Sequence, residues 1–362
     1  MPPSRRAIVK TSPGEARLVS VAIPRIPAGY MLIRTAAVAL NPADWTDIDH
    51  TSYIGCIVGL DYAGTVVQIG EGVRKPFAVG DRVAGLSHGC NVLQPSYGAF
   101  AEYILVKADV QLRIPDGMGW GEAASLGVGV FTAGMGLYHV MGLSLPESGR
   151  ESESTDKDWM LVYGGSSATG SMVIQLAKLS GFKVVTTCSP RNFDLVKQRG
   201  ADVWLDYHHP HIFSLIAEAT SNSLMHAFDT IATDETAAIC AASFAPADTK
   251  EGEKAIYVST LDPTLPASLP RPVEKKYFLG YTLVGEDVLF EDQLLPASEE
   301  DYQFALRFGV LVEKLLGEGR LKNHPVATGV GGSGLEGILG GLDVLRRGEV
   351  SGKKLVYLLE EL

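Results

Sequence analysis

The hydrophobic and polar positions follow two different patterns along this chain. In the first hundred residues, short segments of β-branched and other apolar residues are separated by Gly, Pro or Asp. Five such segments read RAIVK, YMLIRTAAVAL, DYAGTVVQIG, DRVAGL and AFAEYILV. Short strands at this spacing are typical of a partly open β-barrel or sandwich. Around residues 120–141 the pattern changes to small and apolar residues at helical spacing.

Strand and helix patterns alternate after the polar run at 146–158, which we expect to be an exposed loop. Strands are predicted at WMLVYGG, KVVTTCS, DVWLDY, MHAFDTIA and KAIYVST, and helices at SMVIQLAKLSG and NFDLVKQRG. This β-α-β alternation predicts an α/β fold with a doubly wound parallel sheet of the Rossmann type. The chain then returns to helices and closes with the strand KKLVYLL. We therefore expect a Rossmann-type domain at 136–304, inserted into a β-rich domain formed by 1–135 and 305–362.

A glycine-rich turn, Gly164 to Gly170, joins the first strand of this series to its first helix. A helix N-terminus offers unpaired N–H groups and the positive end of the helix dipole, and both attract a pyrophosphate. The match to G-x-G-x-x-G is imperfect, because Ser167 occupies the place of a central glycine. An ordinary turn that binds nothing is the alternative. The residues expected to contact a dinucleotide are Gly164, Gly165, Ser166, Ser167, Ala168, Thr169 and Gly170.

The segment after the second strand indicates which dinucleotide binds. An NAD site usually carries Asp or Glu about 20 residues after the turn, where it bonds the ribose 2′-OH. Here the segment reads TTCSPRN, and no carboxylate precedes Asp194. Ser189 and Arg191 suit a 2′-phosphate by hydrogen bonding and by charge, and Tyr207 follows the third strand. We therefore expect NADPH; a solvated charge at a helix start is the alternative for Arg191.

Composition and charge exclude several classes of function. The chain has 362 residues, with 31 Lys and Arg against 42 Asp and Glu, and a net charge of −11 argues against a general nucleic-acid binder. Because MPPSRRAIVK holds no apolar signal core and no apolar run approaches the length of a membrane span, we expect a cytoplasmic protein without membrane association. The four cysteines form no C-x-x-C pair, so neither a disulfide framework nor a four-cysteine zinc site is expected. The 40 glycines exceed the roughly 25 that average usage gives.

Several motifs in order resemble the medium-chain dehydrogenase/reductase superfamily. They are GLDYAGTVVQIG with GDRVAG, NPAD at 41–44, GAFAEY at 98–103, FTAG at 131–134 and EVSGKKLV at 349–356. The resemblance covers essentially the whole chain. It implies that the β-rich part is a GroES-like catalytic domain beside the Rossmann-type domain.

The place of the superfamily's zinc ligands is altered in this chain. Zinc-dependent members carry Gly-His-Glu and catalytic cysteines, whereas this chain reads Gly59-Leu60-Asp61. His88 and Cys90 offer two ligands, but no third lies at recognisable spacing, and a loop histidine beside a small buried thiol is the reading we favour. The chain therefore resembles the zinc-free branch of quinone and enoyl reductases, and we expect no metal.

Within that branch the chain is similar to fungal trans-acting enoyl reductases. The similar segments are VYGGSSATG, TTCSPRNFDLVKQRGAD and the tail GRLKNHPV…GLDVLRRGEVSGKKLV. Those enzymes serve iterative polyketide synthases whose own reductase domain is inactive, and they accept a substrate tethered to an acyl carrier protein. The resemblance implies NADPH-dependent hydride transfer to the β-carbon of a polyketide enoyl thioester. The alternatives are a reductase of free quinones or enones and a non-catalytic NADPH-binding protein.

The resemblance also implies positions for the catalytic residues. Thr132 in FTAG matches a threonine that lines the nicotinamide site, and Asn41 and Asp44 in NPAD match a loop at the active-site floor. Tyr53 lies about one residue from the place where related enoyl reductases carry a tyrosine proton donor. The structural alternatives are a helix hydroxyl bonded to a backbone carbonyl for Thr132 and turn chemistry beside Pro42 for Asn41 and Asp44.

The remaining candidates lie further along the chain. Asp229 ends a sheet strand, where we expect it to order the turn at the ligand side of the sheet. Gly285 and Glu286 occupy a comparable position beside the nicotinamide, and Lys353 resembles a basic residue near the phosphates, with a charged solvent face as the alternative. An acidic carrier protein requires a local basic patch on this acidic chain. The candidate patches are Arg346-Arg347 with Lys353-Lys354, and Arg271 with Lys275-Lys276.

Overall fold

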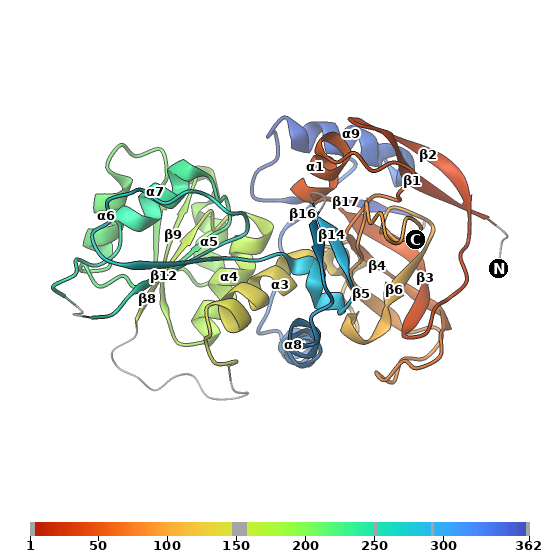
Figure 1. The fold of residues 1–362 in the computed structure, drawn as a ribbon, viewed down its shortest axis with the longest axis horizontal. Coiled ribbons are helices and arrows are strands. Elements are labelled where there is room, and N and C mark those ends of the chain that lie inside the picture. The colour runs from red at the N-terminus through yellow and green to blue at the C-terminus, as the bar shows by residue number, and fades with distance from the viewer. Residues whose placement is uncertain (1–3, 147–157, 250–251, 291–292, 360–362) are drawn as a thin grey trace. The chain divides into compact units, whose positions relative to one another are not determined.

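The chain folds into two compact units. The computed structural model describes residues 4–146, 158–249, 252–290 and 293–359 (Figure 1). One unit comprises residues 1–128 and 281–362, and the other comprises residues 129–280. The sequence prediction places the boundaries after residues 135 and 304, whereas contacts within the structure place them after Val128 and Gly280. The polar run expected to form a loop lies almost entirely outside the described residues.

The first unit is built on a seven-stranded sheet. Its strands are β3 (Tyr30–Ala39), β4 (Asp61–Ile69), β5 (Arg82–Leu86), β6 (Tyr103–Lys107), β7 (Leu112–Arg113), β16 (Val326–Thr328) and β17 (Lys354–Leu358). The order β16-β17-β3-β4-β5-β7, with β6 also on β3, joins the last strand of the chain to the first part. The sheet of this unit therefore takes strands from both ends of the chain.

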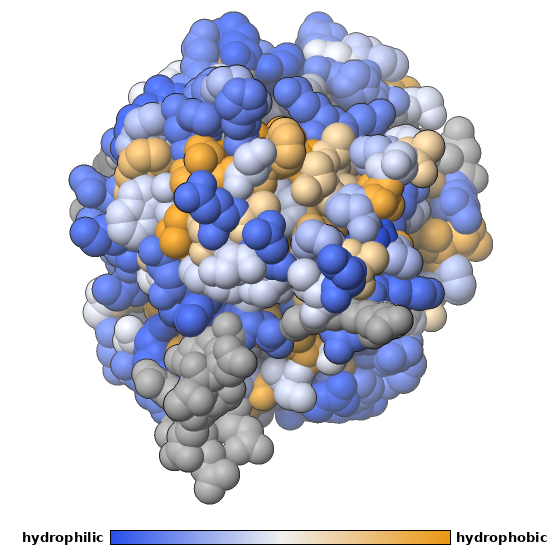
Figure 2. Space-filling view, turned by 90° about the vertical axis from the view of Figure 1, so that its left-hand side faces the viewer, coloured by the Kyte–Doolittle hydropathy of each residue, from blue (hydrophilic) through white to orange (hydrophobic). Residues whose placement is uncertain are grey.

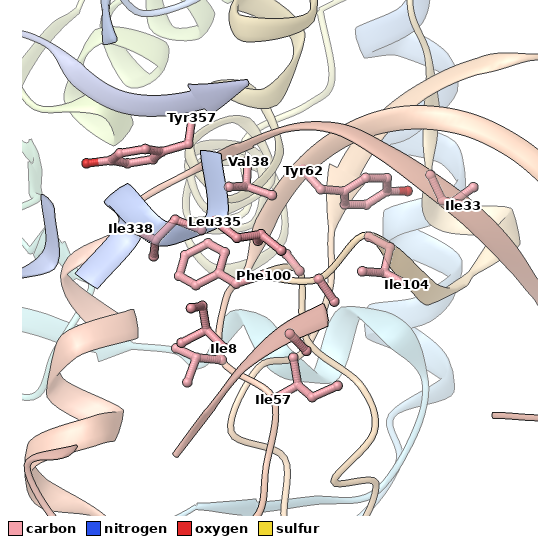
Figure 3. Packing of buried hydrophobic residues seen from close by; sticks show 14 of the residues in the cluster. Ile8, Ile33, Val38, Ile57, Tyr62, Phe100, Ile104, Leu335, Ile338 and Tyr357 are labelled. Carbon is pink, nitrogen blue, oxygen red and sulfur yellow. The ribbon is translucent and has the colours of Figure 1, made fainter. Parts of the chain in front are cut away.

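Smaller elements complete this unit. They are the hairpins β1 (Ser4–Ser12) with β2 (Glu15–Ala22) and β14 (Val288–Phe290) with β15 (Gln293–Leu295), the helices α1 (Pro42–His50), α2 (Trp120–Ala124), α8 (Glu299–Gly317) and α9 (Gly334–Arg346), and the 3-10 turns η1 (Ala108–Val110) and η4 (Gly280–Val284). Helix α9 buries Leu335, Ile338 and Leu342, which share one face at helical spacing. Figure 3 shows Leu335 and Ile338 close to Phe100 and Ile8 in the core of this unit.

The second unit is a six-stranded parallel sheet with helices. Its elements are β8 (Trp159–Tyr163), α4 (Ala168–Leu179), β9 (Lys183–Cys188), η3 (Pro190–Asn192), α5 (Phe193–Gln198), β10 (Val203–Asp206), α6 (Ile212–Ala219), β11 (His226–Asp229), α7 (Asp234–Ala242), β12 (Ala255–Ser259) and β13 (Val273–Tyr277), preceded by α3 (Gly127–Gly134) and the π-helix η2 (Met135–Val140). The strand order is β10-β9-β8-β11-β12-β13, and every pairing is parallel. This order reverses at β8, as a doubly wound sheet requires, so the predicted Rossmann-type fold is confirmed.

The central strands of this sheet are largely buried, because helices cover both faces. Strand β9 buries every residue from Val184 to Cys188, and Leu161 of β8 packs with Ile212 and Ile216 of α6. Figure 2 views the left-hand side of Figure 1 and shows apolar residues in patches interrupted by hydrophilic ones. Within the described ranges, no helix combines the length and apolar character that crossing a membrane demands.

Candidate active site

The glycine-rich turn between β8 and α4 is determined by close packing. Gly164 adopts φ +80°, and a Cβ there would lie 2.7 Å from Oγ1 of Thr230. A Cβ on Gly170 would overlap the carbonyl oxygen of Gly164. Both positions therefore exclude any side chain, which explains why the sequence places glycine at each end of the turn.

Unpaired backbone donors lie at the start of α4. The hydroxyl of Ser167 accepts the N–H of Gly170 at 2.9 Å and caps the helix. In the described part of the chain, the N–H groups of Ala168 and Thr169 donate to no acceptor. With the helix dipole behind them, these donors form an anion site, and the sequence prediction of a phosphate-binding turn has the required geometry.

This turn lies at the point where the strand order reverses. Thr230, directly after β11, donates from Oγ1 to the carbonyl oxygen of Tyr163 at 2.9 Å and lies 3.0 Å from Oγ of Ser167. Strands β8 and β11 are neighbours, so their carboxyl ends form the crevice in which open α/β sheets bind ligands.

The proposed 2′-phosphate residues follow the next two strands. Ser189 comes after β9 and Tyr207 after β10, and their hydroxyl oxygens are 3.5 Å apart. Arg191 is exposed in η3, and its guanidinium has no hydrogen-bond or ion-pair partner among the residues that the structure describes. The structure thus brings Ser189 and Tyr207 together and leaves a cation close by in the sequence.

Asp229 is engaged in the turn between β11 and α7. Its Oδ1 accepts the N–H groups of Ile231 and Ala232, and its Oδ2 accepts the hydroxyls of Thr236 and Tyr257, at 2.6 to 2.9 Å. These four donors fill the acceptor sites of a carboxylate. The side chain is fully buried, so it shapes the turn, as expected, rather than contacting a ligand directly.

A buried polar cluster occupies the first unit. Lys354, the first residue of β17, places its Nζ 2.5 Å from Oδ2 of Asp61 and donates to Oδ1 of Asn41 at 2.7 Å. Asn41 donates from Nδ2 to the same Asp61 oxygen at 2.9 Å. Its backbone N–H donates to Oδ2 of Asp44 at 2.6 Å. We call Asn41, Asp44, Asp61 and Lys354 the polar cluster.

Burial influences which side chains of the polar cluster carry a charge. The side chains of Lys354 and Asp61 are 3% and 0% exposed. Burial, together with the nearby carboxylate of Asp61, raises the pKa of Asp44 well above its usual range. Burial therefore favours the neutral, protonated form of Asp44, and Lys354 and Asp61 form the ion pair of the polar cluster.

The three candidate catalytic residues are divided between the two units. Asn41 and Tyr53 lie in the first unit, and Thr132 lies in α3 within the second. The Thr132 hydroxyl makes no hydrogen bond to any described residue, so the alternative of a hydroxyl bonded to a helix carbonyl is not what the structure shows. Tyr53 is half-buried in the segment after α1.

Comparisons with known proteins identify the family. Residues 27–116 match the alcohol dehydrogenase GroES-like domain. The chain is 39% identical over 363 residues to trans-enoyl reductase caaB of Aspergillus niger, covering 99% of this chain and 98% of that protein. It is 41% identical to trans-enoyl reductase resD of Aspergillus sclerotiorum, covering 97% of this chain and 99% of that protein. The chain belongs to the trans-enoyl reductase family.

Solved structures share the fold of this trans-enoyl reductase. An alcohol dehydrogenase superfamily protein from Novosphingobium aromaticivorans matches with a TM-score of 0.78 at 22% identity, covering 98% of this chain and 100% of that one. A mycobacterial protein in complex with NADPH matches with a TM-score of 0.72 at 20% identity, covering 98% and 99%. The resemblance to the medium-chain superfamily, and the prediction of an enzyme of the enoyl reductase class, are therefore confirmed.

Sequence reasoning missed two members of the polar cluster in this trans-enoyl reductase. Asp61 was noted only as the residue after a missing histidine, and Lys354 only as one half of a charged pair. Lys353 is exposed, whereas Lys354 is buried. A carboxylate at the start of the apolar strand DYAGTVVQI was the one signal that could have identified Asp61, because buried charges require a partner.

Gly285 and Glu286 belong to the first unit of the reductase. Glu286 pairs with Lys107 at 3.0 Å, and a Cβ on Gly285 would lie 2.9 Å from the ring of Tyr302. The glycine-rich turn is part of the other unit. Their role beside a nicotinamide therefore stays a prediction from the resemblance.

The two candidate zinc ligands that the sequence offers, His88 and Cys90, are buried or half-buried among other side chains. Nδ1 of His88 lies 3.1 Å from the amide nitrogen of Asn91, and its ring stacks on Tyr281 at 4.4 Å. Burial lowers the pKa of His88 to about 4 and raises the pKa of the Cys90 thiol. Among the described residues, no group of three or more His, Cys, Asp or Glu could hold a metal ion.

Most cations of the two basic patches expected for docking are paired or buried. Arg346 pairs with Asp49 and Asp343, and Arg347 pairs with Glu349. In the other patch the cations are either buried, as Arg271 is, or paired: Lys275 with Asp262, and Lys276 with Glu274. Lys353 is exposed and has no ion-pair partner among the described residues. The docking role of these patches stays a prediction.

Proposed function

We propose that this trans-enoyl reductase reduces the α,β-unsaturated thioester of a carrier-bound polyketide intermediate, with NADPH as the reductant. Two observations support the proposal. Curated relatives at 39% and 41% identity over nearly the whole chain carry the name trans-enoyl reductase. The unpaired N–H groups of Ala168 and Thr169 supply an anion site at the crevice of the dinucleotide sheet. The proposal depends mainly on the membership of this chain in the trans-enoyl reductase family.

The residues present fit NADPH. The turn from Gly164 to Gly170 would hold the pyrophosphate, and Ser189, Arg191 and Tyr207 would hold the 2′-phosphate. Where an NAD site usually presents a carboxylate to the ribose, this chain presents an unpaired guanidinium. When bound, NADPH supplies a hydride to the β-carbon of the enoyl group.

The chain's own residues orient the substrate and stabilise the charge that develops. As the β-carbon accepts the hydride, the electron pair of the C=C bond moves toward the thioester oxygen. A hydrogen-bond donor facing that oxygen lowers the barrier, and we assign this role to the amide N–H of Asn41. The hydroxyl of Thr132, which has no hydrogen-bond partner among the described residues, would orient the nicotinamide amide. A proton from a side chain or from water then adds to the α-carbon, which completes the reduction.

The partner is the acyl carrier protein of an iterative synthase, and the cytoplasm is the expected location. Most cations of the two candidate basic patches already have local carboxylate partners, and Lys353 is the exposed cation of the first patch that has no partner among the described residues.

A spectrophotometric assay tests the substrate class. NADPH oxidation is followed with a short enoyl pantetheine thioester, with free enones and with quinones. We expect turnover of the thioester. Turnover of quinones alone would contradict the proposal, and tight NADPH binding without oxidation of any acceptor would favour a binding protein.

The cofactor assignment is tested by substitution of the unpaired guanidinium. We expect Arg191→Ala to weaken NADPH by about 10-fold or more and NADH by less than about 2-fold, because only NADPH carries the 2′-phosphate. Fluorescence titration of the reduced cofactor measures both affinities. Lys197→Ala is the matched control, since it removes an exposed cation from the neighbouring helix α5. Equal losses of both cofactors in Arg191→Ala would remove the 2′-phosphate role.

A further inference from the structure

The polar cluster of the first unit holds the side-chain amide of Asn41 from both ends. Oδ1 of Asn41 accepts from Nζ of Lys354 at 2.7 Å, and Nδ2 donates to Oδ2 of Asp61 at 2.9 Å. Lys354 Nζ and Asp61 Oδ2 are themselves 2.5 Å apart. The three side chains therefore form a closed ring of contacts, and all three are nearly inaccessible to solvent.

The chemistry of the two partners allows only one orientation of this amide. A lysine ammonium has donors and no acceptor, and a carboxylate has acceptors and no donor. Rotation of the Asn41 amide by 180° would point its NH₂ group at Lys354 and its oxygen at Asp61. Both contacts would then be repulsive in a buried site, where unpaired polar groups are most costly.

Sheet register brings these residues together from distant parts of the chain. Ala39 of β3 pairs with Asp61 of β4 on one side and with Val356 of β17 on the other. Because side chains alternate along a strand, Lys354 lies on the same face as Val356, two residues later. Asn41 follows β3 and is the N-cap residue of α1. The ring therefore closes where three strands converge on the start of that helix.

One of the two Nδ2 hydrogens of Asn41 makes no hydrogen bond within this ring. Nδ2 carries two hydrogens, and one is used by Asp61. In the described part of the chain, the second hydrogen donates to no acceptor. The ring thus fixes which end of the amide is the donor and keeps one N–H for another partner.

Stability alone does not account for a buried ion pair at this position. Replacing such a pair by apolar residues of similar volume is often neutral or stabilising, because desolvation offsets the attraction. Lys354 and Asp61 nevertheless contribute two full charges to the interior, where Asn41 is the third partner of both. Orientation of Asn41 is a function that apolar substitutes could not perform.

We propose that Asp61 and Lys354 are positioning residues that lock Asn41 in the orientation that donates an N–H to the thioester oxygen of the substrate. The inference rests on the proposed enoyl reduction and adds the residues that set its oxyanion donor. Asp61 also accepts the backbone N–H of Val128 from its Oδ1 at 2.6 Å, whereas the contacts of Lys354 Nζ among the described residues are those with Asn41 and Asp61. The effect of Lys354 on the chemical step therefore requires that Asn41 be present, and Lys354 is the member of the pair on which this dependence is tested.

A double-mutant cycle tests this dependence. We expect Asn41→Ala, Lys354→Met and Asp61→Asn each to lower kcat by about 10- to 100-fold, in the range seen for loss of an oxyanion donor. Lys354→Met added to Asn41→Ala should lower kcat by less than about 2-fold further, because the residue that it positions is already gone. The Kd for NADPH, measured by fluorescence, should stay within about 2-fold of the parent protein.

Controls separate positioning from folding. Lys354→Arg, which keeps the charge and the donors, should recover most of the kcat lost in Lys354→Met. The double variant Asp61→Asn with Lys354→Met removes both buried charges, so it should fold even where a single variant does not, and it should retain the low kcat. Lys314→Met removes an exposed paired lysine of α8 and should leave kcat unchanged.

The outcomes distinguish this inference from the proposed function. Equal losses from Lys354→Met with and without Asn41, or loss of thermal stability with full kcat, would overturn the positioning role while thioester reduction stands. If the parent protein reduces quinones but no enoyl thioester, the proposed function fails. The same cycle measured on the quinone then decides the positioning role, because a quinone oxygen also gains charge. Absence of turnover with every acceptor would overturn both.

Discussion

The glycine-rich turn of the second unit and the polar cluster of the first unit are specified in opposite ways. The turn is made by consecutive residues, and it works because side chains are missing at Gly164 and Gly170. The polar cluster joins Asn41 and Lys354, which are 313 residues apart, through charge and hydrogen bonding. A local motif thus forms the anion site, whereas the buried donor exists only after the whole sheet has formed.

The largest expected effect is the loss of the cofactor site on adding one methyl group to the turn. A Cβ on Gly170 would overlap the carbonyl oxygen of Gly164, and backbone atoms cannot give way as a flexible side chain can. We expect Gly170→Ala to weaken NADPH binding by about 100-fold or more, because α4 must shift away from β8. Fluorescence titration of NADPH provides the measurement.

Gly317→Ala is the matched control for this prediction. It also adds one methyl group within a helix, α8, but nothing in the described structure outside that helix lies within 4 Å of the new Cβ. Alanine is the better helix former, so stability should rise by a few tenths of a kcal/mol to about 1 kcal/mol. Equal weakening of NADPH binding by both substitutions would show that packing at Gly170 is not the cause.

The polar cluster predicts the next largest effect, on stability. Lys354→Met should lower the free energy of unfolding by about 3 to 5 kcal/mol, because it leaves the Asp61 carboxylate buried without its partner charge. Asp61→Asn in addition should restore much of that loss. Urea denaturation of the three variants measures both changes. A double variant less stable than Lys354→Met would show that the ion pair does not determine stability here.

The sequence predicts the second unit better than the first because its signals are local. Parallel strands buried on both faces appear as uninterrupted apolar runs, as in Met160 to Tyr163, and the helix after the turn begins at its capping serine. The edge strand β13 was not predicted. Its residues VEKKY are half polar, because only one neighbouring strand covers it.

The candidate site residues differ in the same way: those marked by local signals are predicted, and those that depend on distant contacts are not. The sequence predicts the turn residues and the pair Ser189 and Tyr207 as site candidates because each follows a predicted strand, and the structure brings the two hydroxyls of the pair together. The sequence predicts neither Asp61 nor Lys354 as a partner of Asn41, because cross-strand register cannot be derived from local patterns. The ion pair between Arg346 and Asp49 cannot be predicted from the sequence for the same reason.

A smaller effect is expected from Asp47, which lies one turn after Asp44 on α1. Burial raises the pKa of Asp47 to about 7, although Lys10 nearby lowers it. Between about pH 4 and pH 7 the folded state therefore binds more protons than the unfolded state, and stability attributable to Asp47 falls as pH rises. We expect the stability of Asp47→Asn relative to the parent to increase by roughly 1–2 kcal/mol across this window and then to level off.

Urea denaturation at several pH values checks this prediction. Asp116→Asn, at an exposed position of the same unit, is the control and should show no such gain. A gain for Asp47→Asn that is the same at pH 4 and pH 8 would show that the carboxyl does not titrate in this window.

The smallest effect is expected for Asp44→Asn, although Asp44 is as deeply buried as Asp61. Burial raises the pKa of Asp44 and so favours the protonated acid, and an amide has the same shape and no charge. The amide oxygen can still accept the backbone N–H of Asn41. We expect a change of less than about 1 kcal/mol in the free energy of unfolding and a kcat within about 2-fold of the parent.

A loss comparable to that in Asp61→Asn would show that Asp44 is ionised. The polar cluster would then hold an excess negative charge, and Lys354 would be shared between two carboxylates instead of being committed, with Asp61, to Asn41.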